Sequence, residues 1–311
     1  MRNLKERSVQ PVSRRKFLKS GSAALAAATA CNAAPYLMAD ALGLPIGLQL
    51  YSVREQLPKD FDGTLKQIGA LGYREVEAAG FFGHSASDVK KAMKAAELNC
   101  VSAHYPLAQL QPKQLEGVIS YAKELGLQYI ICSSPMLKDP SRVSAGNFRN
   151  SMEAMTLDDW RWNAEQFNKL GTKVKAEGMQ FGYHNHVAEF HPENGTIPYD
   201  ELLRLTDPAT VTMEMDCGWV IVGGKNPVDY LTRYPTRISM LHVKDFKLGV
   251  AGTNAEPIST EMGRGSIDYM AILKAAKLAH IRHYFIEQEQ FDIDPMEALK
   301  IDADYMKALK V

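Results

Sequence analysis

The chain has 311 residues, 46% of them hydrophobic, with 36 basic and 36 acidic side chains. This length is enough for one large α/β domain or two smaller ones, and the apolar fraction is ordinary for a globular core. Residues 1–39 hold seven of the basic residues and one acidic residue, so the remainder carries 29 basic and 35 acidic groups. A mildly acidic body argues against a nucleic-acid-binding protein, because neutralising phosphates requires clustered Lys and Arg.

The first 40 residues have the layout of a signal peptide. Residues 13–19 read Ser-Arg-Arg-Lys-Phe-Leu-Lys, which resembles the twin-arginine export signal, and an Ala-rich stretch follows from Gly21 to Met38. A membrane anchor or a plain amphipathic N-terminus is the alternative, but an anchor needs about 20 strongly apolar residues. We therefore predict that residues 1–40 direct export through the twin-arginine translocation machinery to the periplasm.

The cysteines bear on processing rather than on disulfides. Cys31 follows Ala28-Thr29-Ala30, which weakly resembles a lipoprotein cleavage box and would give a lipid-anchored product; cleavage near Ala39 is the alternative. Cys100, Cys132 and Cys217 are widely spaced and odd in number, so they predict buried, inert thiols rather than a disulfide framework.

Strand-like and helix-like runs alternate after residue 44. The eight strand-like runs lie near Ile46–Ser52, Arg74–Ala78, Asn99–His104, Gln128–Cys132, Gln180–His186, Val211–Asp216, Ile238–Lys244 and His283–Glu289. Eight strand–helix units match a (β/α)8 barrel, so we predict a single α/β TIM barrel over residues 41–311. The alternative is an open doubly wound sheet, which has fewer strands and often a glycine-rich phosphate loop; no G-x-G-x-x-G follows the first strand.

Four amphipathic patterns between these strands predict helices that bury one face. Their apolar residues are spaced three and four apart, as in Phe61, Leu65, Ile68 and Leu71, in Leu115, Val118, Ile119, Ala122 and Leu125, in Trp160, Phe167, Leu170 and Val174, and in Ile267, Met270, Leu273 and Ala276. Thr156 to Asp159 predicts a helix start of the capping-box type, with Asp replacing the usual Glu. The longest connection, about Ser133 to Met155, predicts either a lid over the barrel mouth or a surface insertion.

Polar residues end the last four predicted strands in pairs that share a face, because strand side chains alternate with period two. The pairs are His184 with His186, Glu214 with Asp216, His242 with Lys244, and Glu287 with Glu289. Active sites of such barrels lie at the carboxyl ends of the strands, so the pairs predict one polar site at the barrel mouth. Earlier strands add inward-facing residues, namely Gln49, Tyr51, Glu75, Glu77, Ser102 and His104.

One residue from each of these four strands makes a candidate metal-ligand set, consisting of His184, Asp216, His242 and Glu287. A divalent ion needs three or four deprotonated ligands within about 2.0–2.3 Å and room for substrate. Histidine together with carboxylate suits one Mn, Co, Zn or Fe ion better than Ca. The alternative is a hydrogen-bonded polar plug, which is disfavoured because four buried polar groups without another role are costly.

The second members of three pairs are the candidates for proton transfer. His186, Glu289 and Lys244 are the predicted catalytic groups. Lys244 would polarise a carbonyl or bind a hydroxyl; its alternative is an ion pair with Asp245 or Glu289.

Residues of the other strands are candidates for substrate contact. They are Gln49, Glu77, His104 and Trp219. Each has a structural alternative: Glu77 as a partner of a ligating histidine, His104 as a core histidine, and Trp219 as packing rather than a platform for a sugar ring.

The chain resembles the xylose-isomerase-like barrel superfamily, in its sugar phosphate isomerase/epimerase branch, over essentially all of 45–311. The motifs that carry the resemblance are Gly47-Leu48-Gln49-Leu50-Tyr51-Ser52, Tyr183-His184-Asn185-His186, Met215-Asp216-Cys217-Gly218-Trp219, Leu241-His242-Val243-Lys244-Asp245, Gly263-Arg264-Gly265 with Asp268, and Ile286-Glu287-Gln288.

In that family a divalent metal lies at the barrel mouth, held by Glu, Asp, His and Glu from strands five to eight. The resemblance implies Asp216, His242 and Glu287 as ligands, with His184 standing where the ketose epimerases have Glu. Those epimerases use both metal-bound glutamates as acid-base groups, so the change at His184 weakens the case for two-base epimerisation. It favours relatives with the His-Asn-His strand, which resemble inosose dehydratase and keto-sugar lyase or hydratase proteins.

The resemblance also implies the chemistry. The metal binds a sugar carbonyl and an adjacent hydroxyl, a base removes the proton on the next carbon, and the metal stabilises the enediolate. Reprotonation gives isomerisation or epimerisation, and loss of a β-substituent gives elimination.

We therefore expect an exported, metal-dependent isomerase or epimerase of a sugar or keto-sugar, with a lyase, dehydratase or hydratase as the alternative. A non-catalytic sugar-binding protein is the alternative of another class. Export argues against phosphorylated substrates, which are kept mainly in the cytoplasm. The sequence is compatible with a homo-oligomer but does not specify an oligomeric state.

Overall fold

The computed structural model describes residues 42–143, 148–249 and 257–311. The predicted signal peptide, with its arginine pair and Cys31, lies outside these ranges and stays a prediction. Among the helices of the described ranges, none combines the length and the apolar character needed to cross a bilayer.

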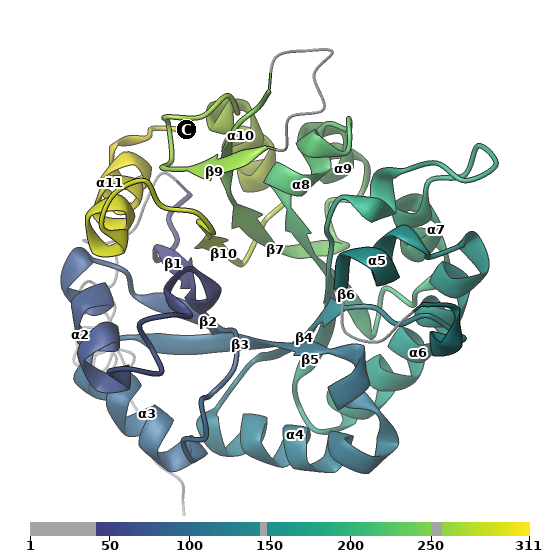
Figure 1. Ribbon diagram of the computed structural model, residues 1–311, viewed down its shortest axis with the longest axis horizontal. Helices are drawn as coiled ribbons and strands as arrows, with labels where there is room; N and C mark the ends of the chain where they lie inside the picture. Colours follow the sequence, from purple (N-terminus) through teal and green to yellow (C-terminus); the bar gives the residue numbers. More distant parts are fainter. Residues whose placement is uncertain (1–41, 144–147, 250–256) are drawn as a thin grey trace, which may run out of the picture. The chain divides into compact units, whose positions relative to one another are not determined.

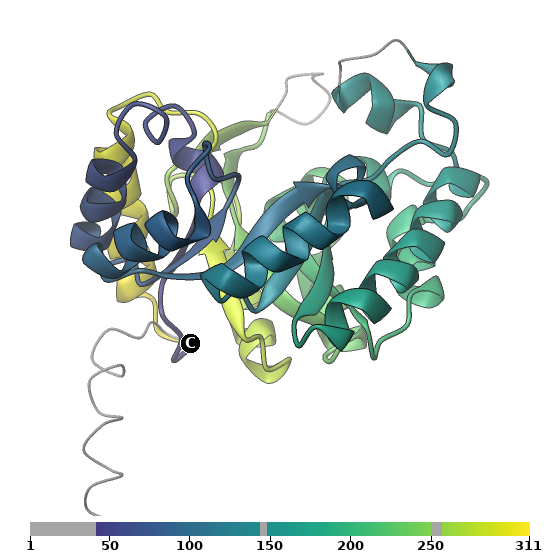
Figure 2. The ribbon, with the colours of Figure 1, turned by 90° about the horizontal axis from the view of Figure 1, so that it is seen from below.

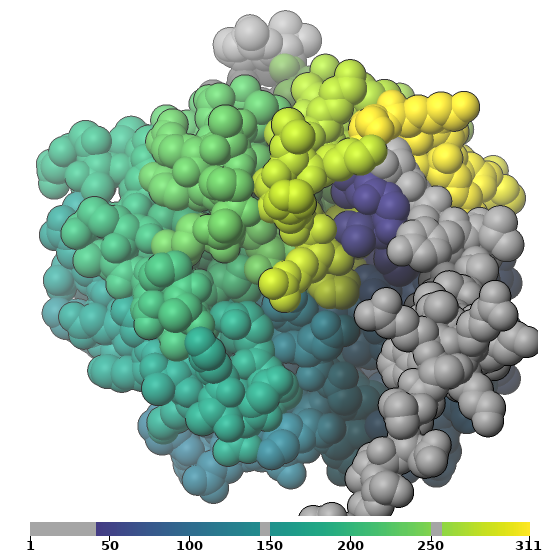
Figure 3. Space-filling model, turned by 180° about the vertical axis from the view of Figure 1, so that it is seen from behind, coloured from purple at the N-terminus to yellow at the C-terminus, as the bar shows by residue number. Residues whose placement is uncertain are grey.

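Eight parallel strands close into a barrel, which confirms the predicted TIM-barrel fold (Figure 1). In chain order they are β1 (Gly47–Gln49), β2 (Glu75–Ala78), β3 (Asn99–Pro106), β4 (Tyr129–Ser134), β5 (Gln180–His184), β6 (Val211–Asp216), β7 (Ile238–Val243) and β10 (His283–Ile286). Each strand pairs with its neighbours in the chain, and β1 pairs with β10 to close the ring. In Figure 3, which views the opposite end, the purple residues near β1 lie beside yellow-green residues from the end of the chain.

Helices surround the strands (Figure 1). They are α2 (Phe61–Leu71), α3 (Ala86–Ala95), α4 (Pro112–Leu125), α5 (Phe148–Glu153), α6 (Leu157–Ala176), α7 (Pro198–Leu205), α8 (Cys217–Val222), α9 (Pro227–Arg233), α10 (Tyr269–Leu278) and α11 (Pro295–Ala308), with short 3-10 turns η2 (Leu50–Val53), η3 (Leu107–Leu110), η4 (Pro140–Arg142) and η5 (Ala188–Phe190).

The predicted capping box starts α6, the longest of these helices. The Thr156 hydroxyl accepts the backbone N–H of Asp159, and the Asp159 carboxylate accepts the backbone N–H of Thr156. Two otherwise unsatisfied N–H groups are thereby paired at the point where the helix begins.

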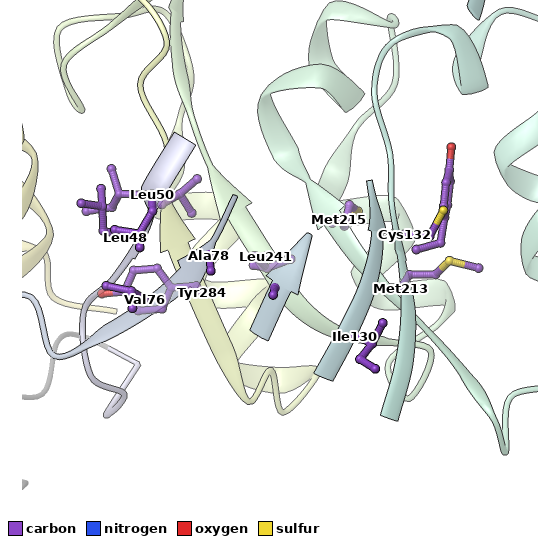
Figure 4. Packing of buried hydrophobic residues seen from close by; sticks show 14 of the residues in the cluster. Leu48, Leu50, Val76, Ala78, Ile130, Cys132, Met213, Met215, Leu241 and Tyr284 are labelled. Carbon is purple, nitrogen blue, oxygen red and sulfur yellow. The ribbon is translucent and has the colours of Figure 1, made fainter. Parts of the chain in front are cut away.

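Period-two alternation sorts the strand side chains into two layers. Outward-facing residues of the strands pack against the helices, and ten of the buried residues are labelled in Figure 4, namely Leu48, Leu50, Val76, Ala78, Ile130, Cys132, Met213, Met215, Leu241 and Tyr284. A smaller apolar cluster consists of Val101, Tyr129, Ile131, Met240 and Phe285. Met240 and Phe285 each precede a mouth residue by two positions, so this smaller cluster fills the barrel interior beneath the polar site.

Several strands are shorter than the sequence predicts. The Gln49 side chain accepts the backbone N–H of Tyr51 and starts the turn η2, so Tyr51 lies outside the barrel sheet. After β10 the N–H of Gln288 donates to the Ser52 hydroxyl instead of to a strand. His186, Lys244 and Glu289 therefore lie in the loops that follow their strands.

Two segments rise above the mouth. One runs from β4 to α6 and includes α5; the other is an antiparallel pair, β8 (Asp245–Lys247) with β9 (Ile258–Thr260). Figure 2 shows both on the same side of the barrel. Residues 152–155 line the cavity at the mouth, as the lid prediction for the first segment requires.

Candidate metal centre at the barrel mouth

Four side chains from adjacent strands converge at the mouth. Ligand atoms of His184, Asp216, His242 and Glu287 all lie within 4.8 Å of one another, and the four residues are buried. The sheet register explains part of this convergence, because Asp216 on β6 lies directly opposite His242 on β7. The structure thus brings together the whole predicted ligand set.

The donor set fits a divalent cation. Two imidazoles and two carboxylates suit Zn, Mn, Co or Fe. Buried Asp216 Oδ2 accepts no hydrogen bond from the described residues, although the Lys244 ammonium lies 3.3 Å away. Asp216 therefore has a buried carboxylate oxygen available for a cation, in a group whose ligand atoms, from two histidines and two carboxylates, lie within 4.8 Å of one another. The cluster therefore fits a divalent metal site, while the role of each residue as a ligand stays a prediction.

A buried layer of carboxylates holds the two histidines of this set. His242 Nε2 lies 2.8 Å from Glu77 Oε1, and its Nδ1 lies 3.0 Å from Glu287 Oε2. His184 Nδ1 lies 3.0 Å from Glu214 Oε2. Carboxylates that contact one ring nitrogen orient the other nitrogen of an imidazole toward a metal.

His104 joins the two carboxylates of this layer. Its Nε2 lies 2.6 Å from Glu77 and 2.7 Å from Glu214. Glu77 accepts further hydrogen bonds from the Gln49 amide, at 2.7 Å, and the Ser102 hydroxyl, at 2.6 Å. His104, Glu214, His184 and His242 form a second group with metal-ligand spacing, which shares both histidines with the first.

Burial and mutual charge divide these groups into ionised and neutral ones. Burial opposes ionisation of Glu77, but His104 and His242 outweigh it and hold the pKa of Glu77 well below its usual value. Burial, together with the charge of Glu77, raises the pKa of Glu214 to about 7. Burial and the neighbouring histidines lower the pKa of His184 well below its usual value, so this imidazole is neutral, the form that binds a metal.

Lys244 lies between three carboxylates. Its Nζ is 2.5 Å from Glu289, 2.9 Å from Glu287 and 3.3 Å from Asp216. Burial alone would lower the pKa of Lys244, but these carboxylates raise it well above its usual value, so the side chain stays an ammonium. The predicted ion pair with Glu289 is present, whereas Asp245 contacts other groups.

His186 follows β5 and lines the mouth beside His184, with ring centroids 4.9 Å apart. Burial and the positive charge of Lys244 lower the pKa of His186 to about 3, so its imidazole is neutral at physiological pH. Fully buried Glu189 supports this loop, because its Oε1 accepts the His186 backbone N–H at 2.9 Å and the Tyr183 hydroxyl at 2.5 Å.

The residues predicted to contact substrate fall at two depths. His104 and Trp219 line the mouth cavity. Gln49 and Glu77 are completely buried and hydrogen-bonded to each other beneath it. Trp219 packs on Phe246, and Lys244 Nζ lies 5.2 Å from the centre of its ring. The substrate-contact roles stay predictions.

The mouth opens into a cavity of about 1480 Å³. His104, His184, His186, Lys244, Glu287 and Glu289 all line it. Of the predicted catalytic and ligand residues, Asp216 and His242 lie just behind this surface, with side chains that are fully buried.

Sequence reasoning missed two supporting carboxylates. Glu189 carries no periodic signal, since it lies in a 3-10 turn rather than on a strand. Asp245 accepts N–H groups of Phe246, Gly263, Gly265 and Ile267, which order the loop after β9. In the sequence, Gly263-Arg264-Gly265 lies about 20 positions after Asp245, and no local pattern links the two.

A family model and individual known proteins both match this chain. The family model described as xylose isomerase-like TIM barrel matches residues 65–309. Inosose dehydratase of Clostridium perfringens strain 13 is 23% identical over 258 residues, covering 76% of this chain and 86% of that protein.

Solved structures agree with this family. A sugar phosphate isomerase/epimerase from Parabacteroides distasonis is 27% identical with a TM-score of 0.67, over 84% of this chain and 96% of that one. The IOLI protein, solved with a bound zinc atom, has the same fold, with a TM-score of 0.60 and 14% identity over 84% of this chain and 96% of that one.

Proposed function

Because the chain belongs to the xylose isomerase-like TIM barrel family, we propose that it is a divalent-metal-dependent enzyme acting on a sugar or keto-sugar. The reaction begins with removal of a proton from the carbon next to a carbonyl. One observation carries this proposal: His184, Asp216, His242 and Glu287 converge within 4.8 Å at the floor of an open cavity.

A divalent ion held by these four residues would polarise a substrate carbonyl and stabilise negative charge on its oxygen. The protein's own groups supply the rest. Neutral His186 and partly exposed Glu289 both line the cavity, and either is a candidate base for taking the proton. The Lys244 ammonium, held by three carboxylates, donates a hydrogen bond to a substrate oxygen as charge develops there.

Elimination is the second candidate reaction. Two observations favour it over epimerisation: a neutral histidine occupies the strand-five position, and the 23% identical relatives include inosose dehydratases. Epimerisation needs one base and one acid on opposite faces of the substrate, and His184 replaces one of the two metal-bound glutamates that fill these roles in the ketose epimerases. Loss of a β-substituent requires only that one base, with Lys244 as a candidate acid for the leaving group.

Solvent exchange followed by NMR tests the proposal. Metal-loaded protein in heavy water is given a panel of ketoses and 3-keto-glycosides. Deuterium in a recovered ketose or its epimer supports isomerisation, and release of an aglycone or water supports elimination. The Asp216→Asn variant should lose the exchange. The Asp302→Asn variant should keep it, because Asp302 is a buried aspartate on α11 that accepts the Met262 N–H away from the mouth. Absence of exchange with every substrate would rule out proton abstraction.

A sugar-binding protein without catalysis is the alternative of another class. The metal content of the protein and the effect of added metal on its activity distinguish the binding protein from the enzyme. Protein isolated without metal, whose activity does not rise on adding Mn, Co or Zn, would favour the binding protein.

We further propose export by the twin-arginine route, supported by the Arg14-Arg15 pair in residues 13–19. Replacing both arginines by lysine should retain the full-length protein in the cytoplasm on cell fractionation. Unchanged recovery from the periplasm would contradict the proposal.

A further inference from the structure

We propose that the substrate is a sugar without phosphate, joined to an apolar group that lies against the α5–α8 side of the mouth. This deepens the proposed function, on which the sugar half of the inference rests. It depends on four features of the mouth: its size, its apolar wall, its low cationic charge, and a backbone cradle that is already filled.

The cavity is large for a single sugar. Its volume of about 1480 Å³ exceeds the range of about 300–1,000 Å³ that is usual for small-molecule sites. The polar groups that fit the proposed chemistry gather at its floor, on the strand ends. The remaining space leaves room for a second part of the substrate.

One wall of this space is apolar. It is formed by the segment around α5 and α6, by α8 and by β8, through Met152, Met155, Trp160, Trp219, Val222 and Phe246. Glu153 and Glu193 are the charged carboxylates on that side, and the Glu193 carboxylate already accepts the Leu157 N–H. Such a wall favours an apolar or aromatic group over a second hydrated sugar.

The mouth offers little cationic charge to a phosphate. Among its described lining residues, Lys244 is the one lysine and there is no arginine. The positive charge of Lys244 is already balanced by the carboxylates of Asp216, Glu287 and Glu289. Arg54 lines a separate small cavity, where it donates to the Glu289 carbonyl and stacks 4.4 Å from the Tyr51 ring.

The backbone cradle typical of a phosphate is occupied by a side chain. TIM barrels frequently bind phosphate with the loops after the seventh and eighth strands. Here the N–H groups of Gly263 and Gly265, each at 3.0 Å, and of Ile267, at 3.2 Å, donate to Asp245. A Cβ at Gly265 would lie 2.0 Å from the same carboxylate. Asp245 thus takes the place and the charge that a phosphate would need.

Calorimetric binding tests the inference. The probes are paired phenyl and methyl β-glycosides of glucose, galactose and mannose, with glucose 6-phosphate and fructose 6-phosphate, added to metal-loaded full-length protein. At least one phenyl glycoside should bind tenfold or more tightly than its methyl partner, and neither phosphate should bind more tightly than its free hexose.

Variants locate the apolar contact. Met155→Ser should reduce the phenyl-to-methyl affinity ratio at least fivefold, whereas Leu278→Ser, on the exposed outer end of α10, should not change it. A hexose phosphate that binds more tightly than the free sugar would overturn the inference, as would phenyl and methyl glycosides of equal affinity throughout. Deuterium exchange into a free ketose alongside such equal affinities would leave the proposed reaction standing without the apolar aglycone.

Discussion

Replacing Asp216 by asparagine should remove most of the stabilisation that a divalent ion gives the barrel, while changing the metal-free protein little. Asn keeps the cap of α8, because its side-chain oxygen can accept the Trp219 N–H that Asp216 Oδ1 accepts at 2.9 Å. Lys244 loses one carboxylate partner but retains Glu287 and Glu289. We expect a loss of about 1 kcal/mol without metal.

The metal-dependent part is larger. An ion present at about 1,000 times its Kd stabilises the folded state by ~4.1 kcal/mol. Residues that contact a metal ligand without binding the metal themselves change metal affinity by about 10–100-fold. Loss of a carboxylate oxygen that binds the ion directly should therefore weaken metal binding by about 100-fold. The same ion concentration is then about ten times Kd and gives ~1.4 kcal/mol. The difference corresponds to a Tm increase smaller by about 5 °C.

Thermal unfolding with and without zinc or manganese measures this. Asp302→Asn is the matched control, because Asp302 is also fully buried, accepts one backbone N–H through Oδ1, and has an Oδ2 without a hydrogen bond from the described residues. The control should show the full metal-induced shift. Equal shifts in the wild type and Asp216→Asn would refute the assignment of Asp216 as a ligand.

Three further predictions follow from buried charges. Glu77→Gln should destabilise the protein by about 3–5 kcal/mol in denaturant unfolding, since it breaks a buried contact with two histidines; Glu177→Gln, which loses an exposed pair with Lys123, should cost about 1 kcal/mol or less. Burial raises the pKa of Asp302 to about 7, so between pH 4 and 7 the folded state holds this proton while the unfolded state loses it. The free energy of unfolding should therefore decrease as the pH rises through that range, by up to about 1.4 kcal/mol per pH unit. Lys244→Met should increase affinity for divalent ions roughly fivefold, because the ammonium 2.9 Å from Glu287 no longer repels them.

Each of these has an outcome that would contradict it. Equal losses in the two glutamate variants would mean that the mouth contact is no stronger than an exposed pair. The same pH slope in the wild type and Asp302→Asn would assign the slope to other groups. Weaker metal binding in Lys244→Met, measured by isothermal titration, would indicate that the lysine supports the site instead of competing with the ion.

The strand alternation predicted the barrel and the identity of the cluster that now fits a metal. His184, Glu214, Asp216 and His242 lie on their strands as predicted and end up in the mouth cluster, whereas Glu287 joins the cluster from the position directly after β10. Whether the second residue of a pair lies on a strand or in a loop was less predictable, because a strand ends where its pairing with the neighbouring strands ends. Lys244 and Glu289 consequently lie in loops, and their pairing at 2.5 Å depends on the path of those loops.

The sequence predicted Glu77 as an inward-facing residue and a possible partner of a ligating histidine, but the contacts of such supporting residues were harder to predict, for a geometric reason. Glu77 on β2 touches His242 on β7 across the barrel, with 165 positions between them. No local pattern encodes such a contact, since it arises from closure of the sheet. The same holds for Asp245, whose partners lie about 20 positions further along in a different loop.

The period-two and helical patterns of the sequence predict the eight-stranded barrel and the strand ends that carry His, Asp and Glu. Those patterns are local, so they can be recognised without knowing which residues are in contact in the folded protein. The folded chain was needed to show which nitrogen of each histidine faces a carboxylate, how the charge of Lys244 is balanced, and that one wall of the mouth is apolar. These properties depend on distances between strands and loops far apart in the chain, which closure of the barrel alone brings within contact.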